Sequence, residues 1–244
     1  MLQMQKLIEG ARLLGLSLTP AQIKCFQTYY DELADWNHRM NLTAIVDYEE
    51  VQVKHFLDSL TVATALSKAP ATVMDVGAGA GLPGVALKIL YPDIALTLVD
   101  SVRKKAVFLN HLVDVLKLDG VQVVAGRAEE LAHDAHYRKR FDAVVSRGVA
   151  RLAVLAELAL PFCKVGGVFI AMKKLDAGDE IDEAGEAIDI MGGRIKQMLR
   201  VEIDDLSDRA LIVIDKIKPT PDKYPRRSGM PQKRPLLQST RGAA

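Results

Sequence analysis

The sequence predicts an α/β fold in which helices cover both faces of a mostly parallel β-sheet. From Ala71 onward, short β-rich runs alternate with helical patterns, a glycine-rich segment follows the first run, and two adjacent β-rich stretches close the series. Strands that alternate with helices form parallel sheets because right-handed crossovers place the helices on both faces. We therefore expect a doubly wound sheet that ends in an antiparallel strand.

The first 66 residues predict helices rather than strands. Thr19 is a candidate N-cap, and Pro20 follows it at the first helical position. Apolar residues then recur at three- and four-residue spacing, as on one face of a helix: Ile23, Phe26, Tyr30, Leu33 and Trp36. A second amphipathic helical segment is expected over about residues 49–66.

The central part of the chain supplies the strands and helices of the predicted sheet. The β-rich runs cover residues 72–77, 95–100, 121–126, 141–146 and 167–173, with helical patterns at 84–91, 103–117, 127–138 and 151–163. An acidic helix is expected over 176–191, followed by two β-rich stretches with no helix between them, 194–203 and 209–217. They predict a terminal hairpin, which is typical of S-adenosylmethionine (AdoMet)-dependent methyltransferases and less expected of a dinucleotide-binding sheet.

Composition places the chain among ordinary globular proteins. Its 244 residues, 49% hydrophobic and 26% charged, are enough for one main domain with appended parts. We expect a helical extension at 1–68, a cofactor-binding domain at 69–217 and an arm at 218–244. No apolar run approaches the roughly 20 residues that span a bilayer, and no signal peptide is expected. Cys25 and Cys163 alone make neither a disulfide framework nor a zinc site, so we expect no metal and a cytoplasmic location.

The C-terminal arm carries a concentrated positive charge. Residues 216–244 hold eight Lys and Arg against Asp222, although the whole chain has a net charge of only +1. Five of the ten prolines lie in 218–244, which shows no periodicity and predicts an extended arm. A basic arm on a mildly acidic body indicates a polyanionic partner such as RNA, although charge alone fits a solubilising tail equally well.

The glycine-rich segment "MDVGAGAGLPG" at 74–84 matches two cofactor patterns. From Gly79 it is a formal G-x-G-x-x-G, the dinucleotide fingerprint, whereas from Asp75 it is the D-x-G-x-G-x-G opening of an AdoMet site. Pro83 removes a backbone N–H where a diphosphate needs donors, and the Asp75 carboxylate would face that diphosphate. These features favour AdoMet and leave an NAD-dependent oxidoreductase as the alternative.

Three acidic residues extend the AdoMet interpretation along the chain. Asp75 would offset the ammonium of the methionine moiety, and Asp100, at the end of the second strand, would bind the ribose hydroxyls. Glu129, in the "GRAEE" segment after the third strand, would hold the adenine. An isolated Asp at a strand end is more often a turn or cap residue, but the ordered set favours a cofactor site.

The chain resembles the glucose-inhibited division protein B family over nearly its whole length. The resemblance is carried by "NLTAI" (41–45), "HFLDSL" (55–60), "DVGAGAGLPG" (75–84), "LVDSVRKKAVFL" (98–109), "GRAEE" (126–130), "FDAVVSRGVA" (141–150) and the "KYPRRSGMPQKRPL" arm. It implies a class I (Rossmann-like) methyltransferase fold and transfer of a methyl group from AdoMet to N7 of a guanosine in bacterial 16S ribosomal RNA. Gly148 departs from the family, in which alanine usually follows the Ser-Arg pair.

The resemblance also implies which residues contact the cofactor. These are Gly77, Leu82, Ala128, Glu129 and Arg147, to which the residues themselves add Gly79 and Asp100. N7 of guanine carries no proton, so no general base is expected, and catalysis should depend on positioning and desolvation. Arg147 is the expected catalytic positioning residue, with a structural salt bridge as the alternative.

Contacts with RNA are expected from basic residues in several parts of the chain. They are Arg39, His55, Lys173, Lys223, Arg226, Arg227, Lys233 and Arg234. For His55, a packed or capping role is an equal alternative. A non-catalytic RNA-binding protein on the same fold is a third hypothesis, although it would require a degraded cofactor loop. We expect the partner to be small-subunit ribosomal RNA or the assembled small subunit.

Overall fold

The computed structural model describes residues 4–175 and 178–237. Residues 1–3, 176–177 and 238–244 lie outside this description, and with them the ends of the predicted helical extension (1–68) and arm (218–244). The start of the predicted acidic helix at 176–191 also lies outside it. The division into three parts remains a prediction, and the elements are described below as they occur.

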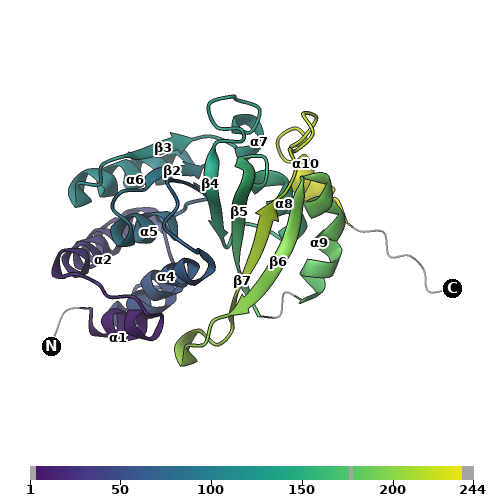
Figure 1. The fold of residues 1–244 in the computed structure, drawn as a ribbon. Coiled ribbons are helices and arrows are strands. Elements are labelled where there is room, and N and C mark those ends of the chain that lie inside the picture. The colour runs from purple at the N-terminus through teal and green to yellow at the C-terminus, as the bar shows by residue number, and fades with distance from the viewer. Residues whose placement is uncertain (1–3, 176–177, 238–244) are drawn as a thin grey trace.

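A seven-stranded sheet forms the centre of the molecule in the order β3-β2-β1-β4-β5-β7-β6 (Figure 1). Its strands are β1 (Thr72–Val76), β2 (Ala95–Asp100), β3 (Val121–Ala125), β4 (Phe141–Arg147), β5 (Cys163–Lys174), β6 (Gly193–Arg200) and β7 (Arg209–Lys216). Strands β1 to β5 pair in parallel, whereas β7 runs antiparallel to both β5 and β6. The predicted parallel sheet with a terminal hairpin is confirmed.

Side chains alternate between two hydrophobic cores, one on each face of the sheet. Along β4, Ala143 and Val145 belong to one core and Val144 to the other, as the period of two in a strand requires. Helices α5 (Gly84–Leu90) and α6 (Arg103–Leu116) cover the first face with the N-terminal helices. The other face is covered by three helices, whose apolar residues belong to the second core: α7 (Ala128–Leu131), α8 (Leu152–Ala159) and α9 (Gly178–Ile190). The predicted helix at 127–138 is therefore shorter than expected.

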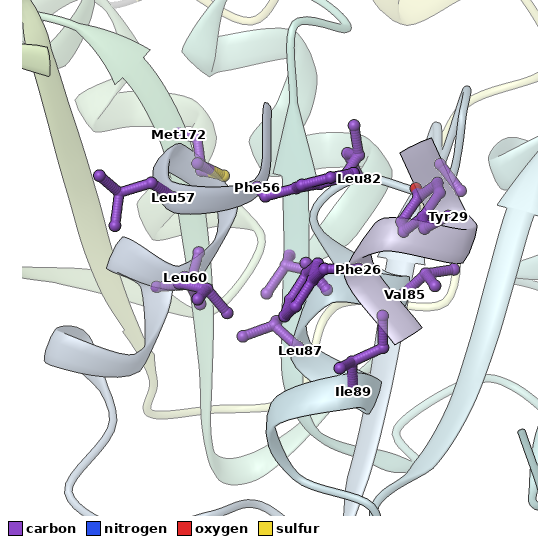
Figure 2. Close-up of a cluster of buried hydrophobic side chains, with 14 of the residues drawn as sticks. Phe26, Tyr29, Phe56, Leu57, Leu60, Leu82, Val85, Leu87, Ile89 and Met172 are labelled. Atoms are coloured by element: carbon purple, nitrogen blue, oxygen red, sulfur yellow. The ribbon is translucent and has the colours of Figure 1, made fainter. Parts of the chain in front are cut away.

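The N-terminal helices share the first core with the central sheet. Helices α1 (Gln5–Leu13) and α2 (Pro20–Met40) are followed by a continuous helical stretch over 48–65. Thr19 caps α2 as predicted, in a reciprocal capping box with Gln22. In Figure 2, Phe26 lies near Leu87 of α5 and Phe56 near Leu82, just before α5. The ring centroids of Phe26 and Phe56 are 5.1 Å apart. The first core is therefore built jointly by both parts of the chain.

The stretch over 48–65 differs from the amphipathic helix expected at 49–66. It consists of α3 (Tyr48–Val51), a π-helix η1 (Gln52–Leu57), α4 (Asp58–Leu60) and a 3₁₀-helix η2 (Thr61–Ala65). Polar residues are buried along it together with the apolar ones: Gln52, His55, Asp58, Ser59 and Thr61. The predicted helical stretch is confirmed, but its polar side chains are buried as well, because other elements cover this stretch and pair with its polar groups.

Residues 218–237 pack against the body of the protein and do not form the extended arm that the sequence predicts over 218–244. This segment contains a short helix, α10 (Met230–Lys233), and packs beside α8 (Figure 1). Thr220 and Pro231 are buried. The Arg138 guanidinium donates hydrogen bonds to the carbonyls of Thr220 (3.0 Å) and Tyr224 (2.9 Å). Prolines lack backbone donors, so here side chains of the body, rather than a regular backbone ladder, hold the segment in place.

Candidate active site

A pocket opens at the carboxyl ends of the parallel strands, next to the point where the strand order reverses between β1 and β4. Its walls include Gly77 after β1, Asp100 at the end of β2, Ala128 and Glu129 after β3, and Val149 after β4. Ligands of open α/β sheets bind at this edge, beside the topological switch point. Four of the predicted cofactor residues, Gly77, Asp100, Ala128 and Glu129, therefore lie together.

The loop after β1 presents bare backbone to this pocket. Gly77 has a φ of 78°, and a Cβ on it would lie 2.3 Å from Cγ2 of Val149. The N–H groups of Gly77 and Ala78 both donate to the Val99 carbonyl, at 2.8 and 3.0 Å. These bonds tie the loop to β2, so glycine is required at position 77 both by backbone conformation and by space.

Asp100 joins the glycine loop to the end of β2. Its Oδ2 accepts a hydrogen bond from the N–H of Gly79 at 2.9 Å, and its Oδ1 accepts one from the N–H of Val102 at 2.8 Å. Each carboxylate oxygen has a second lone pair, and the residue lines the pocket. Asp100 can therefore accept further hydrogen bonds from the hydroxyls of a ribose.

Asp75 does not face the pocket, contrary to the expectation that it offsets the ammonium of AdoMet. Its side chain is fully buried, and its Oδ2 accepts a hydrogen bond of 2.8 Å from the N–H of Gly84, the first residue of α5. Burial raises the pKa of the Asp75 carboxyl to about 7, against the opposing effects of this hydrogen bond and of Arg147. Asp75 holds the start of α5 under the glycine loop.

Leu82 and Gly79 are not among the residues that line this pocket in the described part of the chain. The Leu82 side chain is buried in the first core beside Phe56 (Figure 2). Cofactor contacts of these two residues remain predictions.

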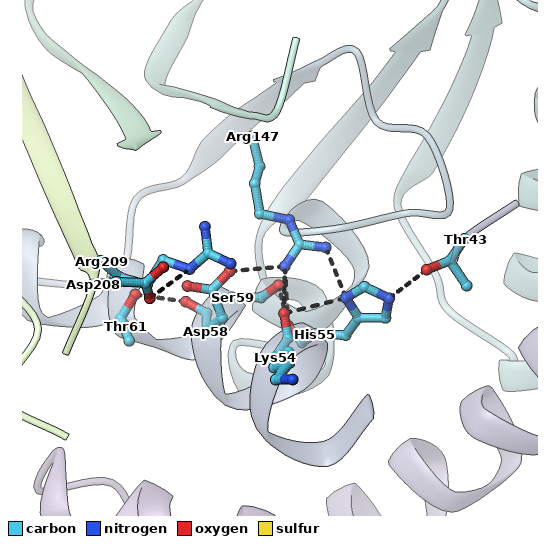
Figure 3. A network of polar contacts seen from close by, with 9 residues as sticks. All are labelled: Thr43, Lys54, His55, Asp58, Ser59, Thr61, Arg147, Asp208 and Arg209. Carbon is cyan, nitrogen blue, oxygen red and sulfur yellow. Dashed lines mark hydrogen bonds and ion pairs between the residues drawn. The ribbon is translucent and has the colours of Figure 1, made fainter. Parts of the chain in front are cut away.

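Arg147 lies at the end of β4 and contacts the N-terminal helices (Figure 3). Its Nη1 donates to Oδ2 of Asp58 at 2.9 Å and to the carbonyls of Lys54 (3.3 Å) and His55 (3.4 Å). Arg147 is two residues after Val145 in β4, so its side chain points to the same face of the sheet, which those helices cover. Arg147 does not line the pocket described above, so the geometry supports the salt-bridge alternative and leaves its cofactor contact a prediction.

His55 belongs to the same network and is buried. One of its ring nitrogens, Nε2, lies 2.8 Å from the Thr43 hydroxyl, and Nδ1 faces Arg147 (Figure 3). Burial, and then the charge of Arg147, lower the pKa of His55 from 6.5 to about 4. The ring is therefore neutral near pH 7, which favours the packed histidine over an RNA contact.

The other basic residues expected to contact RNA divide into paired and exposed groups. Lys173 donates to the Ala150 carbonyl at 3.0 Å and lies 2.6 Å from a carboxylate oxygen of Glu180. Arg226 is bound by Glu157, so these two cations have partners within the protein. Arg39 is exposed, although it pairs with Asp35 and lies over the Trp36 ring. The remaining exposed cations are Lys223, Arg227, Lys233 and Arg234.

Two structural contributions to the pocket were missed from the sequence. Gly229, Pro231 and Gln232 of the C-terminal segment line it, and Gly229 donates its N–H to Oε1 of Glu129 at 2.8 Å. Glu157 is completely buried and holds this segment through Arg226. Its signal in the sequence is a single acidic residue inside an otherwise apolar helix, "LAVLAELA".

Within residues 4–175 and 178–237, no cluster of His, Cys, Asp or Glu could hold a metal ion, and no described helix is long and apolar enough to cross a membrane.

The strand order and the pocket define the class I methyltransferase fold, and solved structures share it. The ribosomal protein L11 methylase from Lactobacillus delbrueckii subsp. bulgaricus aligns with a TM-score of 0.51 at 16% identity, over 70% of this chain and 80% of its own. A variant of MtNAS in complex with S-adenosylmethionine aligns with a TM-score of 0.54 at 15% identity, over 81% and 72%. At these identities the likeness concerns the fold.

Sequence comparison identifies the family. The model of rRNA small subunit methyltransferase G (GidB) matches residues 22–211. A ribosomal RNA small subunit methyltransferase G from Dehalococcoides mccartyi (strain CBDB1) is 48% identical over 96% of this chain and 100% of its own length. One from Lachnoclostridium phytofermentans is 46% identical over 94% and 96%. The chain belongs to this family, which confirms the resemblance found in its motifs, and the comparisons give the oxidoreductase and the non-catalytic alternatives no support.

Proposed function

We propose that this protein transfers a methyl group from AdoMet to N7 of a guanosine in bacterial 16S ribosomal RNA. The observation that carries the proposal is the pocket at the carboxyl ends of β1 to β4, in a chain that matches the methyltransferase G family over most of its length. Both the small-subunit RNA and the assembled subunit offer such a guanosine. The two free cysteines suit the reducing cytoplasm.

The residues of the pocket fit AdoMet. Gly77 lines the pocket without a side chain, and Val149 fills the space that a Cβ would take. We assign the methionine moiety to this loop with Gly79 and Leu82. We assign the ribose to Asp100 and the adenine to Ala128 and Glu129. When bound, AdoMet supplies a methyl group activated by its sulfonium.

The chain's own residues would orient the two reactants and exclude water. The N7 lone pair needs no deprotonation, so a general base is unnecessary. Ser146, beside Arg147, already donates its hydroxyl to the Val76 carbonyl at 2.8 Å, which supports a structural role for it. We assign Arg147 to positioning, because its ion pair with Asp58 fixes the end of β4 where Val149 and Ala150 form the pocket wall.

The test is methyl transfer from radiolabelled AdoMet to small subunits that lack the modification, and to their naked RNA, followed by mapping of the labelled nucleotide. We expect label at N7 of one guanosine in one of the two substrates. Absence of label from RNA, with the protein folded and AdoMet bound, would contradict the proposal. Calorimetric titration with AdoMet and with NAD provides the cofactor control, and tighter binding of NAD would overturn the cofactor assignment.

A further inference from the structure

Residues 225–232, which we call the C-terminal strap, form part of the wall of the cofactor pocket. Gly229, Pro231 and Gln232 line the pocket together with residues that follow β1, β2 and β3. The strap is about 100 residues distant in sequence from Glu129, which it contacts. The pocket is therefore incomplete without a segment that lies outside the sheet and its connecting helices.

A buried carboxylate on α8 clamps the start of the strap. Glu157 accepts hydrogen bonds from the backbone N–H of Arg226 (2.7 Å), from its Nε (2.9 Å) and from its Nη2 (2.6 Å). Glu157 has no exposed surface, and a buried carboxylate is stable only when it is paired and hydrogen-bonded. Val154 and Leu158 of the same helix line the pocket, so the clamp and the pocket wall share one rigid element.

The second attachment of the strap is at the proposed adenine contact. The Gly229 N–H donates to Oε1 of Glu129 at 2.8 Å, and the Ser228 hydroxyl donates to Oε1 of Glu130 at 2.9 Å. A carboxylate accepts several hydrogen bonds, so the strap leaves acceptor capacity on Glu129 while it fixes the orientation of that side chain.

We propose that Glu157 is a positioning residue for cofactor binding, which acts by holding the strap through Arg226 so that Gly229, Pro231 and Gln232 close the pocket beside Glu129. The proposal rests on the proposed function, since it concerns the AdoMet site. Fixing a binding wall in advance raises affinity by lowering the ordering cost of binding. Glu157 thus acts on cofactor affinity without touching the cofactor.

Pro225, the first residue of the strap, and the segment before it have attachments of their own. Nε2 of His133 lies 2.8 Å from the Pro225 carbonyl, and Arg138 donates to the Tyr224 carbonyl at 2.9 Å. Loss of the Glu157 contacts should therefore loosen the strap after Pro225, where only the bonds of Ser228 and Gly229 would remain, while the residues up to Pro225 stay bound.

The experiment compares Glu157→Gln and Arg226→Gln with the matched control Asp189→Asn in the full chain. Asp189 forms an exposed ion pair of 2.9 Å with Lys218, outside the pocket wall. We expect the calorimetric Kd for AdoMet to rise about tenfold in Glu157→Gln and in Arg226→Gln, and to stay within about twofold of the wild type in Asp189→Asn. The KM for RNA substrate and the kcat at saturating AdoMet should change little, which separates this role from general loss of structure.

Limited trypsin digestion gives a second readout, in the wild type and in Glu157→Gln. In the wild type, saturating AdoMet should slow cleavage after Arg227 and Lys233, which are exposed, and cleavage after Arg227 should be faster in Glu157→Gln. Unchanged AdoMet affinity in Arg226→Gln, or no protection of these sites by AdoMet, would overturn the proposal. Failure of the wild type to bind AdoMet would instead overturn the proposed function itself.

Discussion

Arg147 donates a hydrogen bond of 2.9 Å to Oδ2 of Asp58, and this ion pair joins the end of β4 to the helical stretch before the sheet. Asp58 is 3% exposed, and burial raises the pKa of its carboxyl against the opposing effect of Arg147. Asp208 and Arg209 of the terminal hairpin lie in the same network (Figure 3). Three regions of the chain therefore meet beside the cofactor pocket.

Replacement of Arg147 tests whether this junction serves catalysis as well as stability. Arg147→Ala should abolish methyl transfer and lower the free energy of unfolding by about 3 kcal/mol, since removal of one partner leaves a buried charge unpaired. Urea unfolding and the labelled transfer assay measure the two effects. Asp58→Asn, which keeps a hydrogen-bond acceptor, should lose less stability. Unchanged turnover in Arg147→Ala would remove Arg147 from the site.

The buried His55 should make the protein less stable in mild acid. Its pKa is about 4 in the folded protein against an ordinary value of 6.5, so the unfolded chain binds more protons between these values. The contribution of His55 to stability is present above pH 6.5 and is lost as pH falls toward 4. His55→Gln should flatten this part of the stability profile measured by urea unfolding. An unaltered slope in the variant would show that the ring titrates normally.

Asp75 should act in the opposite sense over nearly the same range. Its folded pKa of about 7 lies above the ordinary 3.8, so the folded protein binds more protons between these values, and the contribution of Asp75 to stability falls as pH rises toward 7. Asp75→Asn keeps an oxygen for the Gly84 N–H and cannot ionise. We expect the variant to exceed the wild type in unfolding free energy at pH 8 and to lose that advantage near pH 4. A wild type more stable than Asp75→Asn at pH 8 would contradict the raised pKa of the Asp75 carboxyl.

The sheet and its hairpin could be predicted because their signals are local. Each strand is a short apolar run, and the last two β-rich stretches follow one another with only a three-residue 3₁₀ turn, Asp204–Leu206, between them. The partner of Arg147 could not be predicted, since Asp58 is 89 residues away and only the packed N-terminal helices bring it to β4. The burial of Asp75 could not be predicted either. The sequence places it at the end of a strand, but only the folded sheet shows that its side chain lies under α5 and not toward the ligand.

The C-terminal segment shows a second limit of the sequence. Its prolines and positive charge predict an extended arm, because no period marks a helix or strand over 218–244. The interactions that fix residues 218–237 come largely from single side chains of the body, such as Arg138 and Glu157, to irregular backbone. Such contacts have no repeating pattern, so they become visible only in the folded chain.

The space around Gly77 gives a prediction with a closely matched control. Gly77→Ala introduces a Cβ at a φ of 78°, 2.3 Å from Val149, whereas Gly148→Ala introduces one at a φ of 67° with nothing within 4 Å. Both substitutions carry the left-handed strain of roughly 1–2 kcal/mol, but only the first displaces a residue of the pocket. We expect Gly77→Ala alone to weaken AdoMet binding, by about tenfold or more in calorimetry. Equal losses in both variants would attribute the effect to backbone strain.

The exposed cations of the C-terminal segment should contribute to RNA binding by neutralising phosphates. Lys223, Arg227, Lys233 and Arg234 are exposed, whereas Arg226 is held by Glu157 and is excluded from this set. Replacement of all four by Gln should weaken binding of small-subunit RNA and reduce the slope of log K against log salt by roughly 0.7 to 0.9 for each phosphate that is no longer neutralised. Filter binding at several salt concentrations measures this slope.

A matched variant separates this effect from the removal of four charges in general. Lys6, Arg12, Lys24 and Lys68 are also exposed and lie in the N-terminal part of the chain, away from the strap. Their replacement by Gln changes the net charge equally, so any long-range electrostatic effect is shared, but the cations of the C-terminal segment still neutralise their phosphates. The salt slope of this variant should stay close to that of the wild type. Equal reductions in the two variants would mean that RNA responds to the charge of the whole protein rather than to the C-terminal segment.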